Sequence, residues 1–138
     1  MKNYLGIAVV LISILSLTAW GVSNKKFNLL NAEEVKEIEN MNNNSEDRVK
    51  IEGQDEISSI IADVKENTDD TNRESVNDQP TNINDYLIIK LHHKNVEGGL
   101  SIAFLYKDRN ISYIGQPYSG IWKLSEETFD KISANLIK

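Results

Sequence analysis

The sequence contains no cysteine among its 138 residues. This absence excludes disulfide bonds, thiolate metal sites and cysteine nucleophiles. It also removes the lipid-modified cysteine that anchors a bacterial lipoprotein after its leader is cut. An exported domain without disulfides depends on packing alone, which is more typical of a bacterial cell-surface protein than of a eukaryotic secreted protein.

Catalytic motifs are lacking as well. The two histidines, His92 and His93, are adjacent, and neighbouring side chains of a strand point to opposite faces, so they cannot share one metal ion. A zinc site would need acidic ligands from elsewhere, and no sequence spacing indicates them. Ser119 lacks the preceding glycine that a hydrolase nucleophile elbow uses. The sequence therefore predicts no enzyme, no catalytic residue, no metal site and no cofactor.

After residue 26, the first half of the remaining chain contains few basic residues. Residues 27–83 contain 5 lysines and arginines against 15 acidic residues, a balance of −10, whereas residues 84–138 contain 7 against 6. We expect no nucleic-acid partner, because no basic stripe is present to neutralise phosphates. Two interpretations of the acidic half stay open: a solvated face that aids solubility, and a docking surface for a basic partner or for weakly held divalent cations.

Charge of either sign is absent from residues 4–22, a run of 19 residues that lysines flank on both sides. As a helix this run would be about 28 Å long, close to the bilayer's hydrocarbon core of about 30 Å. A retained single-pass membrane anchor is the first interpretation. A cleaved signal peptide is the second, because Ala19-Trp20-Gly21 and Gly21-Val22-Ser23 offer small residues at the spacing of a cleavage site.

The chain therefore divides into two parts. Residues 1–26 are predicted to be a signal anchor or signal peptide. Residues 27–138 are predicted to form one exported domain outside the cell, held at the cell membrane by the N-terminal helix or secreted if the leader is cleaved.

The first half of this domain contains few clear elements. Residues 35–41 and 48–51 are predicted as short strands on either side of an asparagine-rich turn. From Asp55, a predicted N-cap, the hydrophobic period changes to that of a helix ending near residue 67. Its buried face is predicted to consist of Ile57, Ile60, Ile61 and Val64.

Residues 68–85 carry almost no apolar side chain and are predicted to be a long surface loop. Asp70, Asn72 and Glu74 match part of the spacing of a calcium-binding loop, but Ser75 stands where that loop requires glycine. A plain loop is the favoured interpretation.

The second half shows regular alternation. Strands are predicted at residues 86–93, 100–107, 111–114 and 121–124, and Ser125 is predicted to cap a final helix. In the second of these strands, Leu100, Ile102, Phe104 and Tyr106 alternate with Ser101, Ala103 and Lys107, which predicts a half-buried strand. The predicted fold class is α+β: an antiparallel β-meander with two amphipathic helices on one face, preceded by the N-terminal hydrophobic helix.

Aromatic residues gather around one turn of the meander. Gln116, Pro117, Tyr118 and Trp122 are the candidate partner-binding residues, since aromatics on a turn bury contact area at low entropic cost. Core packing is the alternative for Trp122 and the more common role of such a residue, whereas Tyr118 lies at the turn itself.

Three segments carry a resemblance to a known family: Asn77-Asp-Gln-Pro80, Phe104-Leu-Tyr106 and, most specifically, Tyr113-Ile-Gly-Gln-Pro-Tyr-Ser-Gly-Ile-Trp122. They resemble the bacterial domain of unknown function DUF5301 over about residues 27–136. The resemblance implies a small Gram-positive surface protein with an N-terminal membrane segment or a lipoprotein leader. It implies no activity.

Two functional hypotheses follow. The first is a membrane-tethered, extracytoplasmic binding or sensing module that offers its sheet and the turn at residues 116–122 to a protein partner. The second is an acidic inhibitor or immunity-type protein that binds a basic protein with residues 27–83.

Overall fold

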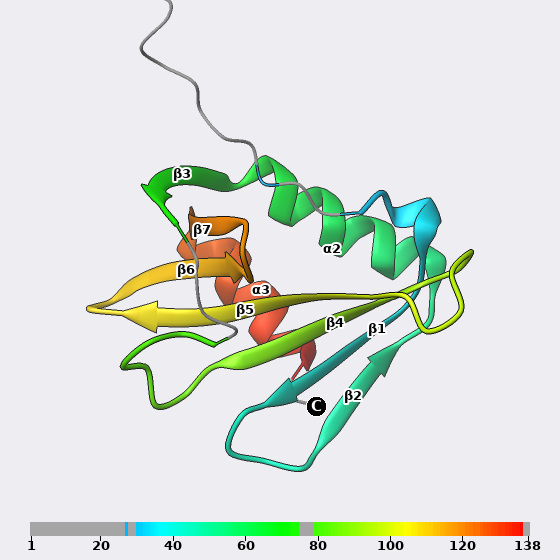
Figure 1. Ribbon diagram of the computed structural model, residues 1–138, viewed down its shortest axis with the longest axis horizontal. Helices are drawn as coiled ribbons and strands as arrows, with labels where there is room; N and C mark the ends of the chain where they lie inside the picture. Colours follow the sequence, from blue (N-terminus) through cyan, green and yellow to red (C-terminus); the bar gives the residue numbers. More distant parts are fainter. Residues whose placement is uncertain (1–26, 28–29, 75–78, 137–138) are drawn as a thin grey trace, which may run out of the picture.

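The computed structural model describes residues 27, 30–74 and 79–136. The predicted signal anchor or signal peptide at residues 1–26 lies outside them. Among the described residues, no helix has the length and hydrophobicity to cross a bilayer. The described part is α+β, as predicted, and contains a seven-stranded antiparallel sheet and two α-helices (Figure 1).

The sheet is built around the predicted meander. Its order is β2-β1-β4-β5-β6-β7-β3, so β4 to β7 follow one another, β1 and β2 extend the sheet beyond β4, and β3 forms the opposite edge. In chain order, the strands are β1 (Val35–Asn42), β2 (Arg48–Ile51), β3 (Thr68–Arg73), β4 (Leu87–His93), β5 (Leu100–Asp108), β6 (Ile111–Gln116) and β7 (Gly120–Leu124).

Both helices pack on the same face of the sheet, as predicted. A short 3₁₀ helix, η1 (Ala32–Glu34), precedes β1; α2 (Gln54–Glu66) follows β2, and α3 (Glu126–Leu136) follows β7 and lies behind the central strands in Figure 1. Lys131 of α3 forms an ion pair with Asp63 of α2 at 2.6 Å. The main core between helices and sheet includes Val35, Ile38, Ile57, Ile60, Ile61, Val64, Leu91, Leu105, Ile114, Trp122 and Ile132.

The helix starts agree with the sequence at α3 and differ at α2. Ser125 Oγ accepts the Thr128 N–H at 3.2 Å, which is the predicted cap. At α2, however, Gly53 occupies the N-cap and the helix begins at Gln54. Asp55 therefore lies in the first turn, where its charge favours the helix dipole, and the prediction that it caps the helix is wrong.

The predicted loop at residues 68–85 begins with a strand. Residues 68–73 form β3, which pairs antiparallel with β7, with Asp69 opposite Lys123 and Asp70 opposite Trp122. Thr71 Oγ1 also donates a hydrogen bond to the Ile121 carbonyl. An edge strand can be held by backbone hydrogen bonds, so it needs no hydrophobic period, and its polar composition conceals it in the sequence.

β5 was predicted as a half-buried strand, and the structure shows apolar side chains on both of its faces. Ala103 and Leu105 belong to the main core, whereas Phe104 and Tyr106 lie on the opposite face in a second buried cluster. Both faces of β5 are therefore apolar, and periodicity alone does not tell which of them the helices cover.

The residues just before β4 are held by the asparagine-rich turn between β1 and β2. Asn43 and Asn44 each donate a side-chain hydrogen bond to the Asn84 carbonyl at 3.0 Å. The Tyr86 N–H donates to Asn43 Oδ1 at 2.8 Å. The predicted turn therefore has a second role: its amide side chains hold the chain where it enters β4.

Candidate binding groove on the open face of the sheet

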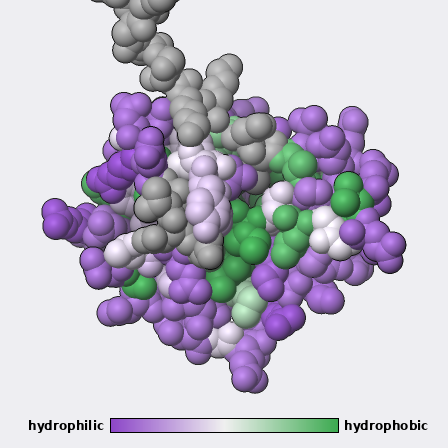
Figure 2. Space-filling model, in the orientation of Figure 1, coloured by the Kyte–Doolittle hydropathy of each residue, from purple (hydrophilic) through white to green (hydrophobic). Residues whose placement is uncertain are grey.

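The face of the sheet opposite α2 and α3, named the open face here, carries a second apolar cluster. The strand register places Ile88 opposite Phe104, and Tyr106 opposite Tyr113, on this face. Figure 2 shows hydrophobic side chains gathered near its centre. The cluster consists of the buried residues Tyr86, Phe104, Tyr106 and Tyr113 and the half-buried residues Ile83, Ile88, Ile102 and Ile121.

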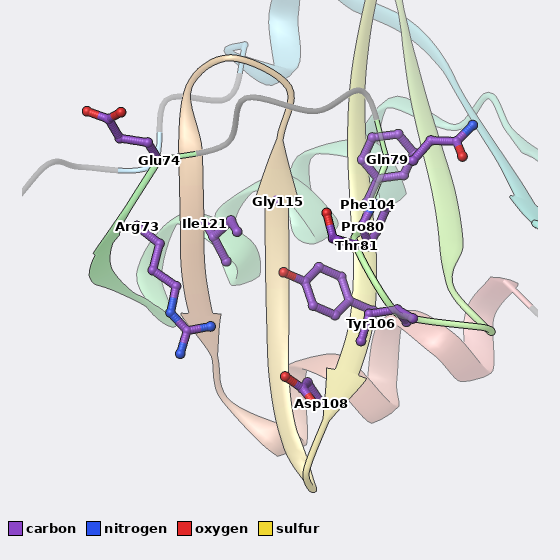
Figure 3. A pocket seen from close by; sticks show the side chains of 11 residues that line it. Arg73, Glu74, Gln79, Pro80, Thr81, Phe104, Tyr106, Asp108, Gly115 and Ile121 are labelled. Carbon is purple, nitrogen blue, oxygen red and sulfur yellow. The ribbon is translucent and has the colours of Figure 1, made fainter.

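A small pocket lies in this face above Gly115. We name it the Gly115 pocket; its volume is about 220 Å³. A Cβ built at Gly115 would lie 3.8 Å from the Tyr106 ring and 3.9 Å from the Ile121 side chain, so the missing side chain leaves space between the two. Pro80 and Thr81 line the pocket from the chain that leads to β4, as Figure 3 shows.

Arg73, at the end of β3, supplies positive charge to the Gly115 pocket. Its guanidinium lies over the Tyr113 ring, 5.4 Å from the ring centroid. Tyr113 in turn stacks on Tyr106, with a centroid distance of 5.6 Å. Burial raises the pKa of Tyr106, and the nearby Arg73 charge offsets part of this increase. The Tyr106 hydroxyl is therefore neutral at physiological pH and can both donate and accept a hydrogen bond.

A wider groove adjoins this pocket. We name it the Pro117 groove; its volume is about 590 Å³, and it shares Phe104 and Gln79 with the Gly115 pocket. Apolar side chains form much of its lining, and Lys90 adds one charged group. The residues of the groove are Gln79, Ile88, Lys90, Leu100, Ser101, Ile102, Phe104, Gln116, Pro117 and Ser119.

Tyr118 projects from the turn beside the Pro117 groove. Its side chain is 74% exposed, and its backbone has φ +60°. The Ser119 N–H donates to the Gln116 carbonyl at 3.1 Å, which closes a four-residue turn with Pro117 and Tyr118 at its centre. A turn with proline second and positive φ third normally places glycine or asparagine at the third position. A tyrosine there is strained, and such strain is concentrated at functional sites.

The four predicted partner-binding residues separate into two groups. Gln116 and Pro117 line the Pro117 groove and Tyr118 stands beside it, so these three lie together on the surface. Trp122 does not join them, because it is only 2% exposed and packs edge-to-face on Phe27 with a centroid distance of 4.8 Å. The structure places Trp122 in the core, which was the alternative interpretation, and not among the surface residues predicted to bind a partner.

The elements that form this surface fall within a known family. A family model for DUF5301, described as a domain of unknown function (DUF5300), matches residues 23–123. The chain belongs to the DUF5301 family. The match contains β1 to β6 and most of β7 and ends before α3, whereas the resemblance in the sequence was expected to extend over residues 27–136.

A solved structure supports the fold of this DUF5301 domain. The NMR structure of a protein from Ruminococcus gnavus matches with a TM-score of 0.61 and 24% identity, over 75% of this chain and 99% of that one. At this identity the likeness shows the fold alone. No curated protein matches the chain.

The histidines of the DUF5301 domain lie on opposite faces of β4, as predicted. His92 lies on the open face and His93 on the other, where its Nε2 is 2.9 Å from Ser101 Oγ. A serine–histidine pair is half of a hydrolase constellation, but a base also needs an acid that orients it. Within the described residues, no carboxylate forms a hydrogen bond or ion pair with the His93 ring.

Acidic residues do lie beside His92, contrary to expectation. Glu37 and Glu39 of β1 share its face, and His92 Nε2 is 3.0 Å from Glu39 Oε2. The hydrogen bond with His92 lowers the pKa of Glu39, with a further contribution from the Arg48 charge, against the opposing effect of burial. The sequence conceals this cluster because His92 and Glu39 are 53 residues apart and only the register brings them together.

The Gly115 pocket was also missed. Its one signal in the sequence is the glycine itself, since a glycine within an apolar strand often marks a place where something approaches the backbone closely. Arg73 gave no signal, because it belongs to the concealed strand β3.

Proposed function

We propose that this chain is a membrane-tethered, extracytoplasmic binding or sensing module without catalytic activity. The observation that carries the proposal is Tyr118: a large aromatic side chain, 74% exposed and held at positive φ, beside the Pro117 groove. Conformational strain and an exposed ring both cost stability, so their combination at the rim of an apolar groove is best explained by contact with a partner.

The sizes of the two hollows favour a protein partner over a small metabolite. Pockets for small molecules have volumes of about 300–1,000 Å³ and enclose most of the ligand. The Gly115 pocket, at about 220 Å³, fits one inserted side chain. The Pro117 groove is larger, at about 590 Å³, but it is shallow and lies open along the sheet. A pocket for one anchoring side chain next to an apolar groove is the usual anatomy of a protein interface centre.

The groove's chemistry supports binding more than catalysis. The amide group of Gln79 can form hydrogen bonds with a partner, and Lys90 can pair with an acidic group. Neither histidine lines the groove. Histidine is the side chain that enzymes use most often for general acid–base catalysis, so such chemistry in the groove would have to proceed without it.

The membrane tether rests on the uncharged run at residues 4–22. Its test is protease treatment of intact cells that produce the full-length chain. We expect the domain to be degraded from outside while the chain sediments with membranes. Protection from protease in intact cells, with degradation only after lysis, would contradict an extracytoplasmic domain.

The binding role is tested by photo-crosslinking in the cells that naturally make the protein. A photoreactive amino acid replaces Tyr118 or Leu100, one at a time, in the full-length chain. The control position is Ile111, a large hydrophobic residue that is 38% exposed, similar to Leu100 at 42%, but lies outside the groove. We expect the same adduct from the first two positions and none from Ile111. Adducts that are equally abundant at Ile111, or absent at all three, would refute the groove as an interface.

The alternative, an acidic inhibitor of a basic protein, receives less support. Several carboxylates of residues 27–83 are already paired with cations: Glu39 with Arg48 at 3.1 Å, and Asp63 with Lys131 at 2.6 Å. The other acidic residues of this half are spread over η1, β1, the turn before β2, α2 and β3. This pairing and this spread give the acidic inhibitor less support than the binding module.

A further inference from the structure

A second candidate site lies on the open face, where β1 pairs with β4. The register places Glu37 directly opposite His92. Glu39 follows two residues later and so lies on the same face of the sheet. One carboxylate oxygen of each glutamate and one nitrogen of His92 all lie within 4.8 Å of one another.

The distances suit a shared central ion. His92 Nε2 is 3.0 Å from Glu39 Oε2 and 3.9 Å from Glu37 Oε1. Ligand atoms about 2.0–2.1 Å from a tetrahedral zinc ion are separated by roughly 3.3–3.4 Å, between these two values. The third separation, between the two carboxylate oxygens, is at most 4.8 Å, so the carboxylates have to turn toward each other for all three atoms to surround one ion.

The site is buried at its base and open at its top. The side chains of Glu39 and Glu37 are 8% and 15% exposed, whereas that of His92 is 37% exposed. The buried carboxylates are held in place by the sheet, and an ion can enter past the imidazole. Three protein ligands leave a fourth position for water or for a group of another molecule.

Three cations lie next to the cluster: Arg48, Lys50 and Lys90, which the register places opposite Glu39. Arg48 binds Glu39 through Oε1, and so leaves Oε2 directed at His92. Arg48 therefore donates the kind of outer hydrogen bond that orients a metal-binding carboxylate. Lys50 lies 3.9 Å from Glu37 Oε1, but its side chain is 58% exposed and can turn into solvent. These charges weaken cation binding without blocking the ligand atoms.

We propose that Glu37, Glu39 and His92 form a binding site for a divalent transition-metal ion, with zinc as the expected ion. Imidazole and carboxylate are both common ligands of zinc, and a histidine with two carboxylates on one rigid sheet matches a three-ligand open site. This inference is independent of the proposed function, because the groove residues take no part in it.

The test is a zinc titration of the full-length chain in detergent micelles, after removal of metals with a chelator. Isothermal titration calorimetry is expected to give one zinc ion per chain. His92→Gln and Glu37→Gln are expected to lower the affinity about tenfold or more, as the loss of one of three ligands requires. His93→Gln is the matched control, since it removes the neighbouring histidine on the opposite face, and it should leave the affinity unchanged.

A second measurement identifies the ligand directly. Zinc should shift the NMR resonances of the His92 imidazole and leave those of His93 in place, and the shift should be absent in Glu37→Gln at the same zinc concentration. Circular dichroism establishes that the variants are folded. The proposal is refuted if zinc does not bind with one-to-one saturation, if His92→Gln binds like the wild type, or if His93→Gln loses as much affinity as His92→Gln. Any of these results would leave the cluster as an ion-pair network alone.

Discussion

Two aromatic residues of one short segment should respond oppositely to truncation. Trp122 and Tyr118 are four residues apart, yet Trp122 is 2% exposed and Tyr118 is 74% exposed. We predict that Trp122→Ala strongly destabilises the domain, and that Tyr118→Gly leaves it equally stable or slightly more stable. The pair therefore tests whether this segment has one ring in the core and one at the interface.

The expected loss at Trp122 follows from its surroundings. Truncation of a buried tryptophan to alanine costs about 3–5 kcal/mol, because the transfer free energy is lost and a cavity remains. The edge-to-face contact with Phe27 is lost too, and such pairs contribute about 0.5–1.5 kcal/mol beyond their buried area. In a domain of this size, a loss of about 3–5 kcal/mol lowers Tm by roughly 10–20 °C.

The expected change at Tyr118 is small and of opposite sign. A non-glycine residue in the left-handed region costs about 1–2 kcal/mol. Glycine removes that strain at φ +60°, but it adds about 0.5–1 kcal/mol of unfolded-state entropy. The net change in the free energy of unfolding is therefore between about zero and a gain of about 1.5 kcal/mol.

The assay is urea unfolding of the full-length chain in detergent micelles, followed by far-ultraviolet circular dichroism. Tryptophan fluorescence is unsuitable, since one variant removes the reporting ring. The reasoning is refuted if Trp122→Ala costs less than about 1 kcal/mol, or if Tyr118→Gly costs more than about 2 kcal/mol, the range of core truncations. Photo-crosslinking from Leu100 in the Tyr118→Gly chain should decrease, even though the fold is intact.

Two further predictions concern the open face. Gly115→Val should fill the Gly115 pocket with little effect on Tm, because a Cβ there meets only ordinary contacts. The same substitution should reduce crosslinking from Leu100. Unchanged crosslinking would mean that no partner group enters the pocket. The second prediction concerns acid: the hydrogen bond with His92 and the charge of Arg48 hold the pKa of Glu39 below the ordinary value of 4.5 for a glutamate. The native state thus binds this proton less readily than the unfolded state, so Glu39 stabilises the fold above pH about 4.5 and this contribution is lost as pH falls through the lower native pKa. Urea unfolding from pH 7 to 3 should show a weaker pH dependence for Glu39→Gln than for the wild type, and equal slopes would contradict this sign.

The sequence predicted the elements that have a hydrophobic period and a clear end. The meander from β4 to β7, the buried face of α2 and the cap at Ser125 all agree with the structure. These features depend on neighbours in the chain, so local residue patterns are enough to find them.

The features that the sequence did not predict depend on contacts between distant segments. β3 is polar and is recognisable only by its pairing with β7. The cluster at His92 requires the register between β1 and β4. The two apolar faces of β5 are distinguished only by the position of the helices. Of the predicted partner-binding residues, Gln116, Pro117 and Tyr118 lie together on the surface, but the sequence could not separate the buried ring of Trp122 from them.

The position of the asparagine-rich turn has a consequence for the Gly115 pocket. Asn43 and Asn44 hold the Asn84 carbonyl by two hydrogen bonds of 3.0 Å. Pro80 and Thr81, which line the pocket, come only a few residues earlier in the chain. We therefore expect a change in the turn between β1 and β2 to shift one wall of a pocket whose other walls come from β3, β5, β6 and β7.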